Sequence, residues 1–598
     1  MKPAALFCIS SLGLGHATRT LPVIRSYLAT HSVHVASYGN ALEYLRRDLS
    51  DADVTFYEMK DYPPLERGSG WRLYWYLLID SLATVLTIRR EHEFVGYVAA
   101  KIRPQFIFSD GRYGSYVPSI PSFILSHQIS FVMPRGLGAF AFVADYFNYR
   151  TFKRFDTLLI PDYEGPEQSL AGKLADHRML KRLNHERIGV LSALRAGDGP
   201  KDIDLLFTVS GYLLEHKDSF VQKLIDQAKK LPGKKVFILG NAKDTSKQAL
   251  EGGSIEIYGS ASGKAKEDLF RRAKCVVSRS GYTTVMDLIE LGTPGYLIPT
   301  PGQTEQEYLA DHLKGRFLVG ASQADFDLSS IDLAALPQPA ANVPWKTDES
   351  LRKIHKAVEE SVALGFFSVI IPVHNEEKYI DKTLVALREL DYPRDRYEVV
   401  VVENGSSDKT YEIAKSYESW GFKVFVSEKG ASKAKNFGMA HASEKSDWFI
   451  LLDADTLIKP SFLADLNSYL RANRAKKLSV GTTTVLPDGA KRLYADLWFA
   501  FYNSGHALTK TSFAIQIMNA IYRSEVRFDE SKTFAEDLKF IKDLRKLGAF
   551  FYFRTKSVVT STRRFDEVGW VRLFFKWNWQ ALVLAHRKME AKPYDVIR

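Results

Sequence analysis

Acidic residues follow three apolar runs in the second half of the sequence. Phe367–Glu377 reads FSVIIPVHNEE, Glu398–Asp408 reads EVVVVENGSSD and Trp448–Thr456 reads WFILLDADT. Each run is typical of a buried strand, and the carboxyl ends of parallel strands meet along one edge of a sheet. Carboxylates gathered there repel one another unless a cation lies among them. Asp453 and Asp455, two positions apart at a strand end, suit a hard divalent ion that bridges a diphosphate.

An Asp-x-Asp pair on its own is more often a surface turn than a metal site. Here the pair follows an apolar strand and two similar strand ends, which favours the metal site. A fourth acid pair, Glu536 and Asp537 in FAEDLKF, precedes an amphipathic helix pattern. The alternative for this pair is ordinary helix N-terminal charge, which complements the dipole. The later segment Ser561–Phe565 reads STRRF, and its arginines are able to meet phosphates.

A glycine-containing loop, Ser10–Arg19 (SSLGLGHATR), lies between a strand pattern and a helix pattern near the start of the chain. Gly13 and Gly15 allow a tight turn, and the helix N-terminus favours an anion. The spacing lacks a third glycine, so a plain strand-to-helix turn is an equal alternative. His16 is a candidate general base because imidazole titrates near neutral pH, and its alternative is a capping or orienting role. Asp110, at the end of a predicted strand, is a rival base.

A second loop region, Ser278–Gln306, reads SRSGYTTVMDLIELGTPGYLIPTPGQTEQ. After a strand that ends at Ser278, the helix opens with small and hydroxyl residues, which suit a diphosphate. Asp287 lies about one turn inside this helix, where a carboxylate can bond a ribose diol. The loop Pro299–Gln306 supplies amides and a carboxylate after a further strand. Two such loops at neighbouring strand ends form a typical ligand crevice.

Short apolar runs alternate with helical patterns throughout, which predicts an α/β protein of parallel sheets covered by helices. The predicted strands are Ala4–Ile9, Val33–Ser37, Phe106–Phe108, Ser122–Leu125, Asp204–Val209, Lys235–Leu239, Ile255–Tyr258, Cys275–Ser278, Gly295–Ile298, Phe367–Pro372, Glu398–Val402, Lys423–Val426 and Trp448–Leu452.

Two breaks divide the chain. Ala193–Asp202 is rich in Gly, Pro and charge and reads as an exposed linker. Leu336–Trp345 is Pro-rich and should be extended, and a predicted helix over Asp348–Ala363 then leads to a fresh strand. We therefore predict folding units at 1–195, 196–364 and 365–598.

The bulk composition is that of a globular protein of several domains, with 598 residues, 45% hydrophobic and 25% charged. Cys8 and Cys275 lie in apolar stretches and read as buried thiols, which excludes a disulfide framework.

No run of about 18 apolar residues predicts a membrane span, and no signal peptide is recognised, so a cytoplasmic location is expected. The net charge of +11 attracts anions: nucleic acid, anionic lipid headgroups and nucleotide diphosphates are candidates, and a plain solvated surface is the alternative.

The motifs resemble two groups of glycosyltransferases. GLGHATR, SRSGYTTVMDLIELG and PTPGQTEQ, over about residues 4–320, resemble GT-B enzymes of the family-28-related group that adds GlcNAc to lipid-linked muramyl precursors. IPVHNEE, VVENGSSD, KGASKAKNFG, LLDADT, the Glu-Asp pair and the late Arg-Arg pair resemble family-2 GT-A enzymes, in family order over about residues 366–570. The fold implied is α/β: a GT-B fold of two Rossmann-like domains, followed by a GT-A fold.

In the first half, the resemblance implies a donor bound mainly by the second domain and an acceptor bound by the first. The donor diphosphate would be held by Ser280, Gly281, Thr283 and Thr284, the ribose by Asp287, and the sugar by Glu305 and Gln306. Gly15 and His16 would line the reaction centre, and no cofactor is expected. The family's glycine-rich loop at the start of the second domain is reduced here to one glycine in Val209–Tyr212, which leaves the donor open.

In the second half, the resemblance implies an inverting transfer with Asp537 as general base. Asp455, with Asp453, would bind Mn²⁺ or Mg²⁺, which neutralises the leaving diphosphate. The nucleobase and ribose would be surrounded by Pro372, His374, Glu376 and Glu403, although the family more often has Asp where Glu403 stands. The remaining contacts to the donor would come from Lys429, Lys435, Arg563 and Arg564.

The sequence thus predicts a bifunctional enzyme that transfers sugars from nucleotide-sugar donors, preferably UDP-sugars, to a glycan or lipid-linked acceptor. In the alternative, only the GT-A half is active and the GT-B half is a docking module. A nucleic-acid-binding protein is suggested by charge alone, and since no recognition motif supports it, no nucleic acid partner is expected. Ile129–Phe147 and the stretch after Asp566 are candidate contacts with the inner membrane surface, with ordinary packing favoured for the second.

Overall fold

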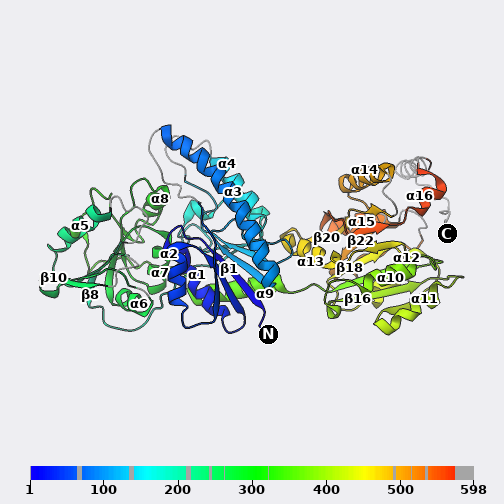
Figure 1. Ribbon diagram of the computed structural model, residues 1–598, viewed down its shortest axis with the longest axis horizontal. Helices are drawn as coiled ribbons and strands as arrows, with labels where there is room; N and C mark the ends of the chain where they lie inside the picture. Colours follow the sequence, from blue (N-terminus) through cyan, green and yellow to red (C-terminus); the bar gives the residue numbers. More distant parts are fainter. Residues whose placement is uncertain are drawn as a thin grey trace. The chain divides into compact units, whose positions relative to one another are not determined.

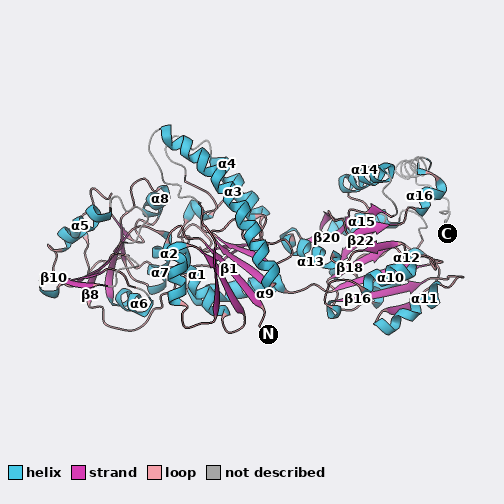
Figure 2. Ribbon diagram, viewed as in Figure 1, coloured by secondary structure: helices cyan, strands magenta, loops and turns pink. Residues whose placement is uncertain are grey.

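The computed structural model describes residues 2–62, 71–132, 141–209, 217–240, 246–261, 263–320, 322–488, 493–512, 515–531, 536–570 and 572. The chain divides into two compact units, Met1–Val362 and Ala363–Arg598 (Figure 1). Both units consist of sheets covered by helices, so the predicted α/β class is confirmed (Figure 2).

The first unit opens with a seven-stranded sheet in which every neighbouring pair is parallel, in the order β3-β2-β1-β4-β5-β6-β7. Its strands are β1 Ala4–Ile9, β2 Ser32–Ser37, β3 Val54–Glu58, β4 Phe106–Asp110, β5 Ser122–Leu125, β6 Thr157–Ile160 and β7 His185–Arg187. The strand order reverses between β1 and β4, and ligands bind at the carboxyl ends of strands at such a switch point. The loop after Ile9 and the carboxylate of Asp110 lie at this position, where Ser10 N donates to Asp110 O at 3.0 Å.

The helices of this first sheet are α1 Leu14–Tyr27, α2 Gly39–Asp48, α3 Trp71–Ile102 and α4 Ala141–Phe152. A later helix, α9 Thr347–Val362, also packs here, because Ile354, Ala357 and Val358 share a buried cluster with strand residues such as Phe7. The ring of His355 stacks on Tyr27 with centroids 4.3 Å apart. The chain therefore returns to its first sheet after completing the second.

The second sheet has the order β10-β11-β9-β8-β12-β13-β14 and is parallel except for β10. Its strands are β8 Ile203–Thr208, β9 Lys235–Ile238, β10 Lys247–Leu250, β11 Ile255–Tyr258, β12 Ala273–Ser278, β13 Gly295–Leu297 and β14 Leu318–Val319. Its helices are α5 Lys217–Ala228, α6 Gly263–Arg272, α7 Tyr282–Leu291 and α8 Thr304–His312. Its switch point lies between β8 and β12, so the loop after Ser278 opens onto it.

The two sheets of the first unit share one buried apolar cluster. Phe152 and Leu158 from the first sheet's side lie in it with Val285 and Met286 of α7. Tyr282, the first residue of α7, donates from its hydroxyl to Pro161 O at 2.7 Å. Two Rossmann-like sheets joined in this way form the predicted GT-B fold.

The second unit contains a mixed sheet in the order β17-β16-β15-β18-β22-β20-β23, and a small sheet β19-β24-β21. Its strands are β15 Phe367–Val373, β16 Tyr397–Glu403, β17 Lys423–Val426, β18 Trp448–Leu452, β19 Thr456–Ile458, β20 Leu478–Thr483, β21 Leu486–Pro487, β22 Ile515–Asn519, β23 Ala549–Phe553 and β24 Val558–Thr560. Its helices are α10 Ile380–Arg388, α11 Thr410–Ser416, α12 Ala431–His441, α13 Phe462–Ala472, α14 Leu493–Thr509, α15 Glu536–Leu547 and α16 Arg563–Val568. β15 to β18 are parallel, whereas β22 runs antiparallel to its neighbours β18 and β20. This is the predicted GT-A arrangement.

Every strand predicted from an apolar run is present, with ends within two residues of those expected. The strands β3, β6, β7, β10, β14 and β19 to β24 were not predicted. Cys8 and Cys275 are both buried, as expected for strand thiols. Among the described residues, no helix is both long enough and apolar enough to span a membrane.

Some predictions fall outside the described residues. They include Ser210–Tyr212 of the reduced glycine loop, residues 133–140 of the apolar segment at Ile129–Phe147, the C-terminal stretch beyond 572, and the side chain of Arg564.

A buried ionic network lies behind the first glycine loop. Arg112 is fully buried, donates to Asp61 at 2.7 Å and lies 3.8 Å from Glu91. Asp61 in turn accepts from the backbone N–H of Ser11 and from the Ser10 hydroxyl. Burial raises the pKa of Asp61, but the charge of Arg112 and these hydrogen bonds outweigh burial and lower it. The network therefore fixes the start of the loop.

We expect Arg112→Met to lower the free energy of unfolding of the first unit by about 3–5 kcal/mol, because two acids would lose their buried cation. The measurement is urea unfolding of the full chain, followed by hydrogen exchange of peptides from that unit. The control is Arg25→Met, which removes an exposed pair with Asp51 (3.2 Å) and should change stability little. Equal effects of the two substitutions would contradict the structural role given to Arg112.

Candidate active sites

The glycine loop of the first sheet touches the first turn of α7 in the second sheet. Gly13 has φ of +91°, which favours glycine, and it directly precedes α1. A Cβ built on Gly15 would lie 2.6 Å from Thr283 Oγ1, so a side chain at this position would collide with α7. The structure thus brings together Gly15 and Thr283, two predicted site residues far apart in the sequence.

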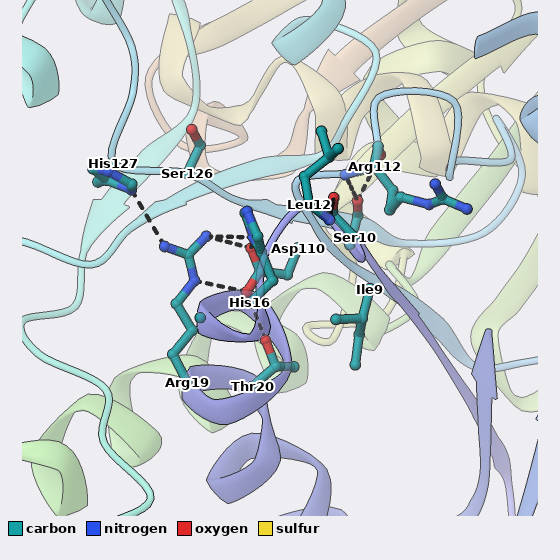
Figure 3. Close-up of polar contacts among 12 residues, drawn as sticks. Ile9, Ser10, Leu12, His16, Arg19, Thr20, Asp110, Arg112, Ser126 and His127 are labelled. Atoms are coloured by element: carbon teal, nitrogen blue, oxygen red, sulfur yellow. Dashed lines mark hydrogen bonds and ion pairs between the residues drawn. The ribbon is translucent and has the colours of Figure 1, made fainter. Parts of the chain in front are cut away.

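His16 and Asp110, which the sequence offered as rival bases, form a pair. His16 Nδ1 lies 2.8 Å from Asp110 Oδ1 (Figure 3). Asp110 is fully buried and also accepts from Thr20 Oγ1 at 2.6 Å and from Arg19 Nε at 2.7 Å. Burial alone would raise the pKa of Asp110, but the charge of Arg19 and the hydrogen bonds from Arg19 and His16 outweigh burial and hold it well below its usual range. Asp110 therefore stays ionised and orients its neighbours.

His16 Nδ1 has two neighbours, Asp110 Oδ1 at 2.8 Å and Arg19 Nη2 at 3.1 Å. A carboxylate only accepts, so the shorter of the two contacts favours the tautomer with hydrogen on Nδ1 and a lone pair on Nε2. The His16 side chain is 25% exposed, whereas Asp110 has no exposed surface. Gly111 makes room for the ring, because a Cβ there would lie 2.8 Å from His16 Cε1. This geometry suits His16 as a base and Asp110 as its positioning residue.

Arg19 and His127, which sequence reasoning missed, extend the pair toward the second sheet. Arg19 Nη1 lies 3.3 Å from His127 Nδ1 (Figure 3), and His127 Nε2 lies 2.8 Å from Glu305 Oε1. Because arginine only donates, Nδ1 of His127 accepts and Nε2–H donates to Glu305. Burial lowers the pKa of His127, which agrees with this neutral form. The ring also stacks on Tyr282 with centroids 4.1 Å apart.

The predicted donor residues of the second sheet lie around the start of α7 and α8. Ser280 Oγ donates to Gln306 O at 2.7 Å, and Gln306 Oε1 accepts from the Thr300 hydroxyl at 2.8 Å. Gly281 caps α7 and has open space beside it. Thr284 is half-buried in the same turn. The start of α7 thus brings together Ser280, Gly281, Thr283 and Gln306.

Two predicted donor contacts already have protein partners. Asp287 is buried, accepts from Ser192 Oγ at 2.5 Å and lies 3.5 Å from Lys266 Nζ. Glu305 is bonded to His127 and also accepts from Gln128. A ribose or sugar contact through either carboxylate would have to replace or share these bonds.

In the second unit, several of the predicted acids lie in two clusters with basic side chains. In one cluster, Arg563 donates to both oxygens of Glu376 at 2.8 and 2.6 Å and lies 3.3 Å from Asp455 Oδ2. In the other, Lys435 donates to Asp537 Oδ1 at 2.8 Å and lies 3.9 Å from Glu536.

Lys435 is buried at the centre of its cluster. Burial lowers its pKa, but the charges of Asp537, Asp453 and Glu536 outweigh burial and raise it. Lys435 therefore stays charged and electrostatically links Asp537 to Asp453. Burial, with the charge of Asp537, raises the pKa of Glu536.

The other predicted nucleotide contacts line the same edge. Pro372 lies in β15 opposite Val402, and His374 follows that strand half-buried. Glu403 is buried and accepts from the backbone N–H of Ser406. Lys429 packs beside Gly405, whose φ is +89°, with 3.6 Å between its Cβ and a Cβ built on that glycine. Among the described residues, no group of three or more His, Cys, Asp or Glu side chains is arranged to hold a metal ion.

The sequence comparisons agree with this geometry. Residues 218–324 match the glycosyltransferase family 28 C-terminal domain, and residues 368–526 match glycosyl transferase family 2. The first unit is thus similar to GT-B enzymes and the second to family-2 GT-A enzymes, as the motifs predicted.

Two curated proteins and one solved structure are among the matches. A Methanococcus voltae dolichyl N-acetyl-alpha-D-glucosaminyl phosphate 3-beta-D-2,3-diacetamido-2,3-dideoxy-beta-D-glucuronosyltransferase is 26% identical over 217 residues, 33% of this chain and 67% of that protein. Glycosyltransferase AglE of Haloferax volcanii is 42% identical over 84 residues, and this match covers 13% of the chain and 28% of that relative. The glycotransferase of kitacinnamycin is 16% identical with a TM-score of 0.38, over 60% of this chain and 96% of that one.

We expect His127→Gln to make the first unit less sensitive to acid. The pKa of His127 is lower in the folded state, so the unfolded state binds the proton at a higher pH. The free energy of unfolding is therefore fully present above about pH 6.5 and falls as the pH drops, by up to about 1.4 kcal/mol per pH unit. The measurement is urea unfolding at about pH 7 and about pH 5.5. His185→Gln, at an exposed position, serves as the control and should keep the wild-type pH dependence. An unchanged pH dependence in His127→Gln would refute the neutral tautomer.

Proposed function

We propose that the chain is a bifunctional glycosyltransferase that acts in the cytoplasm, at the inner membrane surface. It transfers two sugars from nucleotide-sugar donors, preferably UDP-sugars, to a glycan or lipid-linked acceptor in cell-surface glycan synthesis. One observation supports the proposal: each unit by itself brings a candidate acid–base group together with a charged partner, near residues predicted to contact the donor. These groups are His16 with Asp110 in the first unit and Asp537 with Lys435 in the second.

In the GT-B half, His16 Nε2 takes the proton of the acceptor hydroxyl as its oxygen attacks the anomeric carbon. The bond from that carbon to the diphosphate breaks, and the leaving oxygen carries the electron pair. Ser280, Gly281, Thr283 and Thr284 surround the start of α7, whose free N–H groups favour the diphosphate. Asp110 keeps Nδ1–H in place and stabilises the imidazolium that forms.

In the GT-A half, Asp537 takes the proton of the acceptor hydroxyl, and attack opposite the leaving group inverts the anomeric centre. Lys435 holds the Asp537 carboxylate in place. Asp455 with Asp453 fits Mn²⁺ or Mg²⁺, because both residues are only partly buried and follow β18. Such carboxylates suit ions that take their other ligands from water and substrate phosphates. When bound, such an ion neutralises the leaving diphosphate. Pro372, His374, Glu376 and Glu403 face the nucleoside.

A lipid-linked acceptor is supported by apolar residues on the surface of the first unit. Tyr97 of α3 and Phe142 of α4 are each 71% exposed, and Leu86 and Tyr146 are also exposed. Exposed Arg90 on α3 adds positive charge. Apolar rings with basic neighbours suit a membrane surface. A relative named for a dolichyl phosphate substrate supports the same kind of acceptor.

The double substitution Phe142→Ser and Tyr146→Ser should weaken binding of the full chain to vesicles that contain anionic lipid, because it removes exposed rings from α4. Vesicle co-sedimentation gives the measurement. Leu333→Ser, at another exposed apolar position of the first unit, is the matched control and should bind as the wild type does. Unaltered sedimentation of the double variant would exclude α4 from membrane contact.

The second candidate keeps the GT-B half as a docking module. It is favoured by the bonds of Asp287 to Ser192 and of Glu305 to His127 and Gln128, which occupy two of the expected donor contacts. In this case, only the GT-A half turns over.

Incubation with a panel of nucleotide-sugars, with release of nucleotide diphosphate as the readout, distinguishes the two candidates. Asp537→Asn should reduce release from one donor by about 10²–10⁴-fold and leave the other unchanged, and His16→Ala should do the reverse. The control is Asp395→Asn, an acid of the second unit whose side chain is 81% exposed. Loss of all release in Asp537→Asn supports the docking module, and full release in both variants would overturn both assignments.

A further inference from the structure

Arg563, the first residue of α16, joins two acids that follow different strands, Glu376 after β15 and Asp455 after β18. Both of its terminal nitrogens bond Glu376, at 2.8 and 2.6 Å, and one of them lies 3.3 Å from Asp455. Its guanidinium also lies over the ring of Tyr379, 4.4 Å from the centroid. All three charged side chains are largely shielded, with 14–18% of their surface exposed. In this arrangement, Asp455 has a cationic neighbour supplied by the protein itself.

The backbone holds Arg563 in this position. Strand β24 pairs with β19, which begins directly after Asp455, and Ser561 N donates to Asp455 O at 3.2 Å. Thr562 N donates to Asp488 Oδ1 at 2.8 Å. The segment that carries Arg563 is thus tied to the strand end that carries Asp455, so the contact is part of the fold.

A guanidinium and a divalent ion compete for the same carboxylate. Two positive charges in contact with Asp455 repel each other, and a shielded site screens that repulsion less than water does. In the described part of the chain, no cluster of three or more ligand side chains compensates for it. An ion at Asp455 therefore needs either additional ligands from a bound diphosphate or the withdrawal of Arg563.

We propose that Arg563 is the resting counter-ion of Asp455 and Glu376, so that a divalent cation binds weakly until a nucleotide diphosphate draws the guanidinium away. The inference rests on the proposed role of Asp455 as a cation ligand. Arginine bonds phosphate oxygens in the same forked geometry as carboxylates, so the diphosphate is a suitable second partner for it. Metal and nucleotide then strengthen each other's binding by the same factor.

The test is the affinity of the full chain for Mn²⁺, measured by electron paramagnetic resonance of the free ion, with and without UDP. The wild type should bind Mn²⁺ weakly alone and more tightly with UDP. Arg563→Gln should bind Mn²⁺ alone at least about tenfold more tightly than the wild type, because the competing charge is gone. The enhancement by UDP should shrink in this variant. A gain of binding is not a result that damage to the fold produces.

Two further variants sharpen the test. Arg554→Gln removes the same charge from an exposed position of the same unit and should leave Mn²⁺ affinity within about twofold of the wild type. Glu376→Gln leaves Asp455 as the charged partner of Arg563, so Mn²⁺ alone should bind no more tightly than in the wild type. If Arg563 only held α16 in place, Arg563→Gln and Glu376→Gln would have the same affinity for Mn²⁺ alone.

The outcomes separate this inference from the proposed function. Equal affinity of the wild type and Arg563→Gln for Mn²⁺ alone would overturn the counter-ion role and leave the proposed transfer reaction standing. Failure of every variant to bind Mn²⁺, even with UDP, would remove the ion from the proposed reaction and the counter-ion role with it. If Arg563→Gln is the only variant that binds Mn²⁺ more tightly than the wild type, the result supports both the counter-ion role and the ion in the proposed reaction.

Discussion

An ionised side chain that is shielded from water needs a partner of opposite charge, and this requirement organises both units. Asp110 lies against Arg19 and His16, Arg112 lies between Asp61 and Glu91, and Lys435 lies against Asp537. Asp110 ends β4 and Arg112 follows it closely, whereas Lys435 lies on α12 and Asp537 on α15. The same contacts that satisfy buried charge therefore also hold the candidate catalytic groups in one orientation.

In the first unit, these contacts cross from one sheet to the other. The hydrogen-bonded series from Asp110 through Arg19 and His127 ends at Glu305, on the donor side of the unit. Every proton in the series is assigned, because arginine only donates and carboxylates only accept. Arg19 holds His127 in the tautomer that donates to Glu305, so hydrogen bonds join the proposed acceptor and donor sides without a bound ligand.

Much of the fold could be predicted from local patterns, whereas the partners of the site residues could not. Buried parallel strands are continuous apolar runs, and runs such as Phe367–Pro372 mark their own position. β3 (VTFYE) and β10 (KQAL) carry polar residues and lie at sheet edges, so they lack that signal. Arg19 and His127 gave no signal, because a single arginine in a helix or a histidine after a strand fits many structures.

Helix spacing likewise placed Asp287 at the right depth in α7 but could not show that its face is turned toward Ser192. The contact between Asp455 and Arg563 joins residues far apart in the chain, and only the pairing of β19 with β24 brings them together. The residue types of the candidate sites could therefore be predicted from the sequence, whereas the bonds between them depend on tertiary packing.

The return of α9 to the first sheet makes the first Rossmann-like domain discontinuous in the chain. Its strands come before β8, but part of the apolar cover of β1 and α1 comes from Ile354 and Val358. A recombination event that exchanged only the stretch from β8 onward would also replace this cover with a foreign helix. Replacement of the second Rossmann-like domain without loss of α9 therefore requires two crossover points, one before β8 and one before α9.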